Sequence, residues 1–166
     1  MIIYLVGYMG VGKSTIGNAL AEQRQYPFLD IDEIITSLEG KDINTIFKEM
    51  GEQYFRKLEK RVLSGLQHLT RAVIATGGGL PCFNNNMDIL NASGITVYLK
   101  ASVDFLANRL IQSTDRPIIE DNRVDLTKFI STHLAERTKY YEQASIVVKA
   151  EASIEEVVSA IQSQLE

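Results

Sequence analysis

The segment GYMGVGKS at residues 7–14 has the spacing G-x-x-x-x-G-K-S, and the rest of the sequence is best interpreted outward from it. The apolar run IIYLV precedes it, and an amphipathic stretch follows it. Glycines let the backbone turn so that successive N–H groups point at phosphate oxygens, and the start of the next helix adds partial positive charge. Lys13 can then reach the β- and γ-phosphates, and the Ser14 hydroxyl can ligate Mg²⁺. A simple strand-to-helix turn needs neither side chain, so the segment predicts a nucleoside triphosphate site.

Around this loop, short β-branched runs alternate with longer amphipathic stretches, which is the pattern of a parallel sheet covered by helices. Continuously apolar runs predict strands at residues 2–6, 28–30, 72–75, 95–99 and 146–148. Helical periodicity predicts helices at residues 13–25, 31–38, 43–49, 52–69, 84–92, 103–112, 126–141 and 154–165. The fold class is therefore α/β, and a length of 166 residues fits a single domain over residues 1–166.

Single residues predict where some of these helices begin and end. Gly40, Gly51 and Gly94 each follow a helical pattern, where a left-handed C-cap needs a residue without Cβ. Asp42 precedes the helix predicted at residues 43–49, where its carboxylate can accept a hydrogen bond from a free backbone N–H group.

Composition limits the classes of partner. The chain has 17 Lys and Arg against 21 Asp and Glu, a net charge of −4, whereas nucleic acids are bound by basic surfaces. A bound anion must therefore be held by a local group of cations. Cys82 is the single cysteine, which suits a reducing compartment, and no apolar run is long enough to span a membrane. We expect a cytoplasmic protein without nucleic-acid or membrane partners, in which His68 and His133 are surface or packing residues.

The second predicted strand leads into two carboxylates, in the segment FLDID at residues 28–32. The carboxyl ends of parallel strands line the ligand crevice of an α/β sheet. Asp30 and Asp32 are two residues apart, so an extended chain points both side chains to one side. With the loop at residues 7–14, this pair predicts carboxylates that hold Mg²⁺ and accept a proton from a substrate hydroxyl. The alternative is that Asp32 caps the next helix and Asp30 is a solvated strand end.

Four further segments carry weaker signals. The glycines in TGGGLP, residues 76–81, exceed what a turn needs and predict close approach of the backbone to a ligand. Arg56 in YFRKLE and Arg137 in ERTKYY lie in predicted helices, where a lone arginine is usually solvated. Residues 113–125, STDRPIIEDNRVD, have no helical period and predict a surface loop of the kind that forms functional lids. Arg116 in that loop could bring positive charge to a transferring phosphate.

Taken in order, these segments resemble the shikimate kinase family over essentially the whole chain, through GYMGVGKST, FLDID, YFRKLE, ATGGGLP, DRPII and ERTKYYEQAS. The resemblance implies a P-loop NTPase fold like that of nucleoside monophosphate kinases: three α/β/α layers with a five-stranded parallel sheet. It implies a substrate-binding region at about residues 31–60 and a lid at about residues 113–124. The implied reaction is ATP-dependent phosphorylation of the 3-hydroxyl of shikimate, on the way to chorismate and the aromatic amino acids. The expected partners are shikimate and ATP, with Mg²⁺ as cofactor, and the expected state is a monomer.

The resemblance also implies roles for individual residues. The residues that would bind ATP are Gly10, Val11, Gly12, Lys13, Ser14, Thr15, Arg109 and Arg116. Those that would bind shikimate are Asp32, Arg56, Gly77, Gly78, Gly79 and Arg137. Ser14 would hold Mg²⁺ directly and Asp30 through water. The catalytic residues would be Lys13, Asp32 and Arg116.

Two other functions are compatible with the phosphate loop. Another small-molecule kinase of this fold, acting on gluconate or a nucleoside monophosphate, would keep Lys13 and Ser14 but need a different acceptor site. A regulatory nucleotide-binding domain without catalysis would be favoured by loss of Lys13, Asp32 or Arg116, and all three are present.

Overall fold

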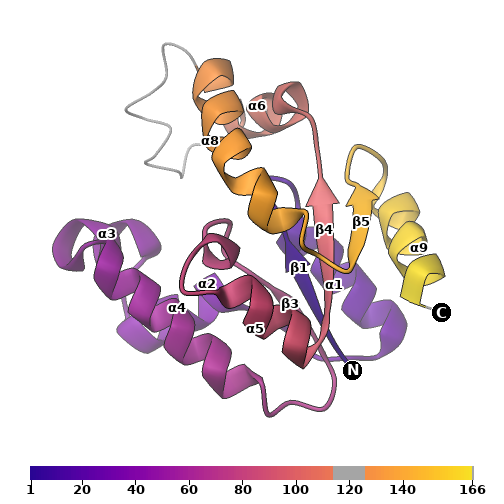
Figure 1. Ribbon diagram of the computed structural model, residues 1–166, viewed down its shortest axis with the longest axis horizontal. Helices are drawn as coiled ribbons and strands as arrows, with labels where there is room; N and C mark the ends of the chain where they lie inside the picture. Colours follow the sequence, from indigo (N-terminus) through magenta and orange to yellow (C-terminus); the bar gives the residue numbers. More distant parts are fainter. Residues whose placement is uncertain (114–125, 166) are drawn as a thin grey trace.

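A computed structural model describes residues 1–113 and 126–165 of the chain, and Figure 1 shows how the elements are arranged. All strand pairs are parallel, and one five-stranded sheet has the order β2-β3-β1-β4-β5. The strands are β1 (Ile2–Val6), β2 (Phe28–Asp30), β3 (Ala72–Ala75), β4 (Ile95–Lys100) and β5 (Ile146–Lys149). The predicted sheet is thus confirmed. Its central strand β1, buried along its whole length, leads directly into residues 7–14.

Helices cover both faces of this sheet, which confirms the three-layer architecture (Figure 1). Helices α1 and α9 pack together on one face, and α5 and α8 lie on the other, while α2, α3 and α4 follow β2 as a group at the edge of the sheet. The helices are α1 (Lys13–Arg24), α2 (Ile31–Glu39), α3 (Ile43–Met50), α4 (Glu52–Leu66), a short 3₁₀ helix η1 (Leu80–Cys82), α5 (Asn86–Ser93), α6 (Val103–Ile111), α8 (Leu126–Tyr141) and α9 (Ile154–Leu165). Within the described ranges, no helix is long and apolar enough to cross a membrane.

One departure from the predicted helices lies between β3 and α5. The sequence predicts one helix over residues 84–92, but α5 begins only at Asn86. Asn84 and Asn85 both have φ +54°, in the left-handed region, so they cannot continue a right-handed helix. The preceding residues Leu80–Cys82 form η1, which the sequence pattern did not indicate.

The glycine predictions hold in part. Gly40 caps α2 with φ +64°, and Gly51 ends α3 with φ +83°, although its ψ of 168° is outside the left-handed helical region. The prediction for Gly94 is wrong, because its φ of −170° is extended. A Cβ at Gly94 would lie 2.6 Å from the carbonyl oxygen of Ile2, so the glycine is needed for close packing against β1. Asp42 caps α3 as predicted, since its Oδ1 accepts a hydrogen bond from the backbone N–H of Thr45 at 2.8 Å.

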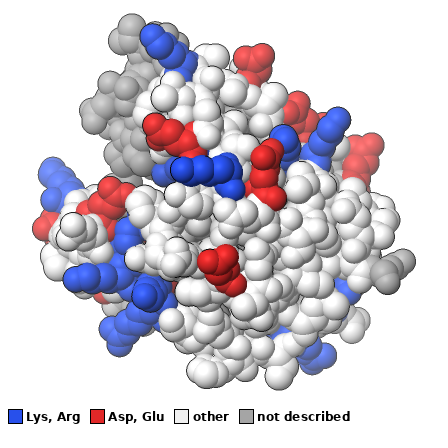
Figure 2. All heavy atoms as spheres, viewed as in Figure 1, with Lys and Arg blue, Asp and Glu red and all other residues white. Residues whose placement is uncertain are grey.

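Charge is distributed unevenly over the surface. On the face drawn in Figure 2, Lys and Arg side chains gather over the region of α4 and elsewhere alternate with Asp and Glu. Helix α4 carries exposed Lys57, Lys60 and Arg61. Local positive charge therefore exists on a chain whose net charge is −4.

Candidate active site

The loop at residues 7–14 wraps around the ammonium group of Lys13. Gly10 has φ +79° and Gly12 has φ +107°, which side chains with a Cβ rarely adopt. The buried Nζ of Lys13 donates hydrogen bonds to the carbonyl oxygens of Gly7 at 2.7 Å and Tyr8 at 3.0 Å. The loop thus encloses a positive charge at the carboxyl end of β1, beside the first turn of α1.

Asp30 and Asp32 do not lie together on an extended segment, as the sequence pattern predicted. The chain is extended only to Asp30, because α2 begins at Ile31. The helix cap is Asp30, not Asp32: its Oδ1 accepts a hydrogen bond from the backbone N–H of Asp32 at 3.0 Å. Its Oδ2 accepts a hydrogen bond from the Ser14 hydroxyl at 2.6 Å. This brings a hydroxyl and a carboxylate together at the start of α1, the oxygen donors that suit Mg²⁺.

Gly77, the first of the three consecutive glycines, faces two carboxyl groups. A Cβ at Gly77 would lie 2.9 Å from Oδ1 of Asp32 and 3.0 Å from Oε1 of Glu59. A side chain at this position would collide with both, so glycine allows the carboxyl groups of α2 and α4 to converge on the end of β3.

The next two glycines each face an arginine. A Cβ at Gly78 would lie 3.1 Å from the backbone nitrogen of Met9 and 3.6 Å from Nη1 of Arg137. A Cβ at Gly79 would lie 2.6 Å from Nη2 of Arg56. The glycine run therefore brings the phosphate loop and two guanidinium groups to one place, as the resemblance implied.

Arg56 is held by two acidic residues of its own helix. Its Nη1 donates to Oε2 of the buried Glu59 at 2.8 Å. Its Nη2 donates to Oε1 of the exposed Glu52 at 3.2 Å. Only 12% of the Arg56 side chain is exposed. The lone helical arginine of the sequence is thus a fixed and partly desolvated cation, not a solvated surface residue.

Glu59 is a member of this site to which the sequence assigned no role. The available signal was its position three residues after Arg56, since helical residues at this spacing are neighbours. Burial raises the pKa of the Glu59 carboxyl to about 7, and the nearby Asp32 carboxylate raises it further. The positive charges of Arg56 and Arg137 act in the opposite direction and lower this pKa. Desolvation outweighs the attraction of the arginine because the side chain is only 1% exposed.

We expect the titration of Glu59 to make the free energy of unfolding depend on pH. The folded-state pKa of Glu59 lies above its ordinary value of 4.5, so the folded protein holds a proton that the unfolded chain releases. The resulting stabilisation is complete below the unfolded pKa and disappears as the pH rises through about 7. Relative to Glu59→Gln, which cannot titrate, the wild-type free energy of unfolding should fall by about 1–3 kcal/mol between about pH 4.5 and about pH 8. Urea unfolding of both proteins across this range measures it, and parallel pH profiles would contradict the assignment.

Arg137 lies where α8 meets the phosphate loop. Its guanidinium carbon is 6.0 Å from the ring centre of Tyr8. The Tyr141 hydroxyl donates to the carbonyl oxygen of Gly78 at 2.6 Å, which ties the same helix to the glycine run. The Tyr8 hydroxyl is hydrogen bonded to Nδ1 of His133 at 2.8 Å. Burial, and next the charge of Arg137, lower the pKa of His133 to about 4, so His133 is a neutral packing residue at neutral pH.

The remaining predicted residues are distributed between described and undescribed parts of the chain. Nε of Arg109, on α6, donates to the carbonyl oxygen of Gly10 at 2.7 Å, so this arginine lies against the phosphate loop. His68 is exposed. Arg116 and the predicted lid, apart from Ser113, lie outside the described residues.

Comparisons with known proteins agree with this geometry. The family model for shikimate kinase matches residues 9–166. A shikimate kinase of Azobacteroides pseudotrichonymphae is 46% identical over 148 residues, which is 87% of each chain. The crystal structure of shikimate kinase from Bacteroides thetaiotaomicron has 38% identity and a TM-score of 0.92, covering 99% of this chain and 98% of that one. Shikimate kinase from Acinetobacter baumannii in complex with shikimate has 32% identity and a TM-score of 0.92, covering 99% and 92%. The resemblance is confirmed, and this chain belongs to the shikimate kinase family of enzymes.

Proposed function

We propose that this chain transfers the γ-phosphoryl group of ATP to the 3-hydroxyl of shikimate, giving shikimate 3-phosphate and ADP. This is the known activity of the family, in aromatic biosynthesis. The observation that supports it best is the surroundings of Gly78, where an added Cβ would lie 3.1 Å from the backbone nitrogen of Met9 in the phosphate loop and 3.6 Å from Nη1 of Arg137. A phosphate-binding loop and a carboxylate-binding arginine are thus neighbours, as transfer to a small carboxylic acid requires.

The ATP side of the site is assigned to residues 10–15, with Lys13 as counterion to the β- and γ-phosphates. Mg²⁺ fits the oxygen donors here: Ser14 would hold it directly and Asp30 through water, as their 2.6 Å hydrogen bond supports. When bound, Mg²⁺ would neutralise charge on the phosphates. Arg109, held against the loop, is assigned to the adenine side of ATP, and Arg116 to the transferring phosphate.

The shikimate side of the site is assigned to Arg56 and Arg137, because two guanidinium groups can hold a planar carboxylate with paired hydrogen bonds. The backbone N–H groups of residues 77–79 are assigned as further donors to the substrate, because these glycines lie against Asp32 and both arginines. Asp32 would accept a hydrogen bond from the attacking hydroxyl and orient it toward the phosphate. Desolvation of these charges by a closing lid at residues 113–124 is part of the same proposal.

We further propose that the protein works as a cytoplasmic monomer, without nucleic-acid or membrane partners. The single cysteine, Cys82, supports a reducing compartment, and the net charge of −4 disfavours binding to nucleic acid.

The proposal is tested by ADP release from purified protein with ATP and Mg²⁺. Shikimate, gluconate, AMP and no acceptor are compared at equal concentrations. Of the three acceptors, we expect only shikimate to raise the rate of ADP release above the acceptor-free rate. Release with gluconate or AMP and none with shikimate would overturn the proposed substrate.

Arg56→Lys is expected to raise the KM for shikimate. Lysine keeps the charge but cannot reproduce the planar fork that binds a carboxylate through two parallel hydrogen bonds. Impairing a charged hydrogen bond costs about 1.5–3 kcal/mol, which corresponds to a rise of about 10- to 160-fold in KM. Steady-state kinetics with each substrate varied in turn measures the effect. A change confined to the KM for ATP would show that Arg56 does not bind the acceptor.

A further inference from the structure

The Arg56 guanidinium is stacked against aromatic rings as well as paired with carboxylates. Its Cζ lies 4.1 Å from the ring centre of Phe83, 5.4 Å from that of Phe55 and 5.9 Å from that of Phe47. Phe47 and Phe55 belong to α3 and α4, whereas Phe83 comes from the loop between β3 and α5. The closest ring is therefore supplied by a different part of the fold from the arginine that it covers.

The loop that carries Phe83 has a defined and strained conformation. Asn84 and Asn85, the two residues after the ring, both have φ +54°, a region that asparagine tolerates better than most residues but at some cost. Asn86 is completely buried, and its Nδ2 donates to the carbonyl oxygen of Leu80 at 2.8 Å. Its backbone N–H donates to the carbonyl oxygen of Phe83 at 2.9 Å. These bonds close a tight turn whose first residue is Phe83.

Filling the core does not account for this ring. Phe83 remains 36% exposed, so much of its apolar surface stays in contact with water. The Arg56 guanidinium lies over this ring, at a separation where the face of an aromatic ring attracts a guanidinium group. The same loop also touches the arginine through Gly79, whose added Cβ would lie within 2.9 Å of Nη1, Nη2 and Cζ.

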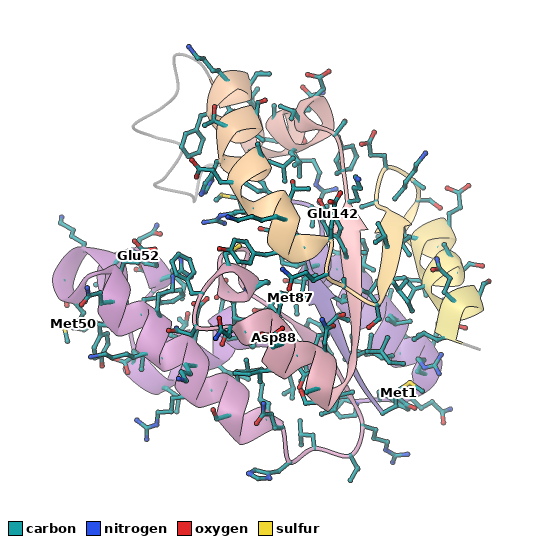
Figure 3. All side chains as sticks on the ribbon, in the orientation of Figure 1. Met1, Met50, Glu52, Met87, Asp88 and Glu142 are labelled. Atoms are coloured by element: carbon teal, nitrogen blue, oxygen red, sulfur yellow. The ribbon has the colours of Figure 1, made fainter. Side chains whose placement is uncertain are left out.

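Arg56 makes two kinds of contact, hydrogen bonds to carboxylates and a contact with an aromatic ring, and they restrain its guanidinium group in different directions. Glu59 accepts a hydrogen bond from the N–H groups of Arg56, and so does Glu52, which is labelled in Figure 3; such bonds lie near the guanidinium plane. The guanidinium carbon of Arg56 lies over the Phe83 ring, 4.1 Å from its centre. The carboxylates limit rotation within the plane, and the ring limits movement of the guanidinium toward the ring. Both motions would misalign a fork that must meet a substrate carboxylate with two parallel bonds.

We propose that Phe83 is a positioning residue that holds the guanidinium plane of Arg56 in the orientation that binds the substrate carboxylate. This role rests on the proposed function, in which Arg56 binds shikimate. Phe83 acts through Arg56 and not on the phosphoryl group, so its loss affects acceptor binding and leaves ATP binding and the transfer step unchanged.

The test compares Phe83→Leu, which keeps an apolar side chain without a π face, with Phe83→Tyr, which keeps the ring. Phe83→Leu should raise the KM for shikimate on the order of 3- to 30-fold, with kcat and the KM for ATP unchanged. Phe83→Tyr should stay within about twofold of wild type, since the stacking face is retained. Phe83→Met serves as the second ring-free variant should Phe83→Leu fail to fold, which thermal unfolding detects.

Tyr26→Leu is the matched control. The Tyr26 ring also lies near an arginine, with Cζ of Arg24 5.7 Å from its centre, but it precedes β2, whereas the site residues follow the carboxyl ends of β1, β2 and β3. Its removal should leave both KM values unchanged. A wild-type shikimate KM in a folded ring-free variant overturns the proposal, as does a fall in kcat equal to the rise in KM.

Arg56→Lys, measured in parallel, separates this proposal from the proposed function. A normal shikimate KM in Arg56→Lys refutes the acceptor role of Arg56 itself. A raised KM in Arg56→Lys together with a normal KM in Phe83→Leu refutes only the role of the aromatic ring.

Discussion

Lys13→Ala is expected to lower kcat by at least about 10²-fold, equivalent to about 2.7 kcal/mol or more of transition-state stabilisation. The Lys13 ammonium is buried in the loop and bonded to the carbonyl oxygens of Gly7 and Tyr8, so its charge lies within the loop that is assigned to the phosphates. Its removal leaves the developing charge on the γ-phosphoryl group without this counterion. Turnover of ATP and shikimate by purified protein measures the loss.

The control for this prediction must separate lost charge from a collapsed loop. Lys13→Met fills much of the same space without charge and should lose activity to a similar extent, with thermal unfolding reporting the integrity of the fold. Lys60→Ala removes an exposed lysine of α4 and should keep wild-type turnover. Near-normal kcat in Lys13→Ala would show that the phosphate loop does not act as proposed.

Asp32→Asn is expected to lower kcat by about 10²- to 10⁴-fold while the KM for ATP changes little, if Asp32 acts as a general base. Asparagine keeps the shape of the side chain and loses the negative charge that faces Gly77. A loose transition state needs less help from a base, so a smaller fall in kcat assigns Asp32 to orienting the hydroxyl.

Asp88→Asn provides the matched substitution. Asp88 lies in the first turn of α5, as Asp32 lies in the first turn of α2, and its side chain is exposed (Figure 3). This variant should retain wild-type kinetics. Normal turnover in Asp32→Asn would remove Asp32 from the reaction, whereas equal losses in both variants would indicate a general effect of lost carboxylates.

Much of the fold could be predicted because its signals are local. A strand buried on both faces is a short apolar run, and a covering helix repeats its apolar residues every three or four positions. These periods located the five strands and most helices to within a few residues. The ends were less certain: the pattern at residues 52–69 extends past the end of α4 at Leu66. Helix ends depend on local competition for hydrogen bonds, which apolar periodicity does not record.

The phosphate loop and the family could be predicted from residue types alone, because both depend on short, fixed spacings within residues 7–14 and five further segments. Three features could not be predicted in this way: Asp30 caps α2, Glu59 is buried beside Arg56, and the guanidinium of Arg56 lies over the Phe83 ring. The Asp30 cap depends on where the chain stops being extended, and the pKa of Glu59 depends on how deeply its side chain is buried. The separation of 27 positions between Arg56 and Phe83 is closed by the packing of α4 and the β3–α5 loop at one edge of the sheet.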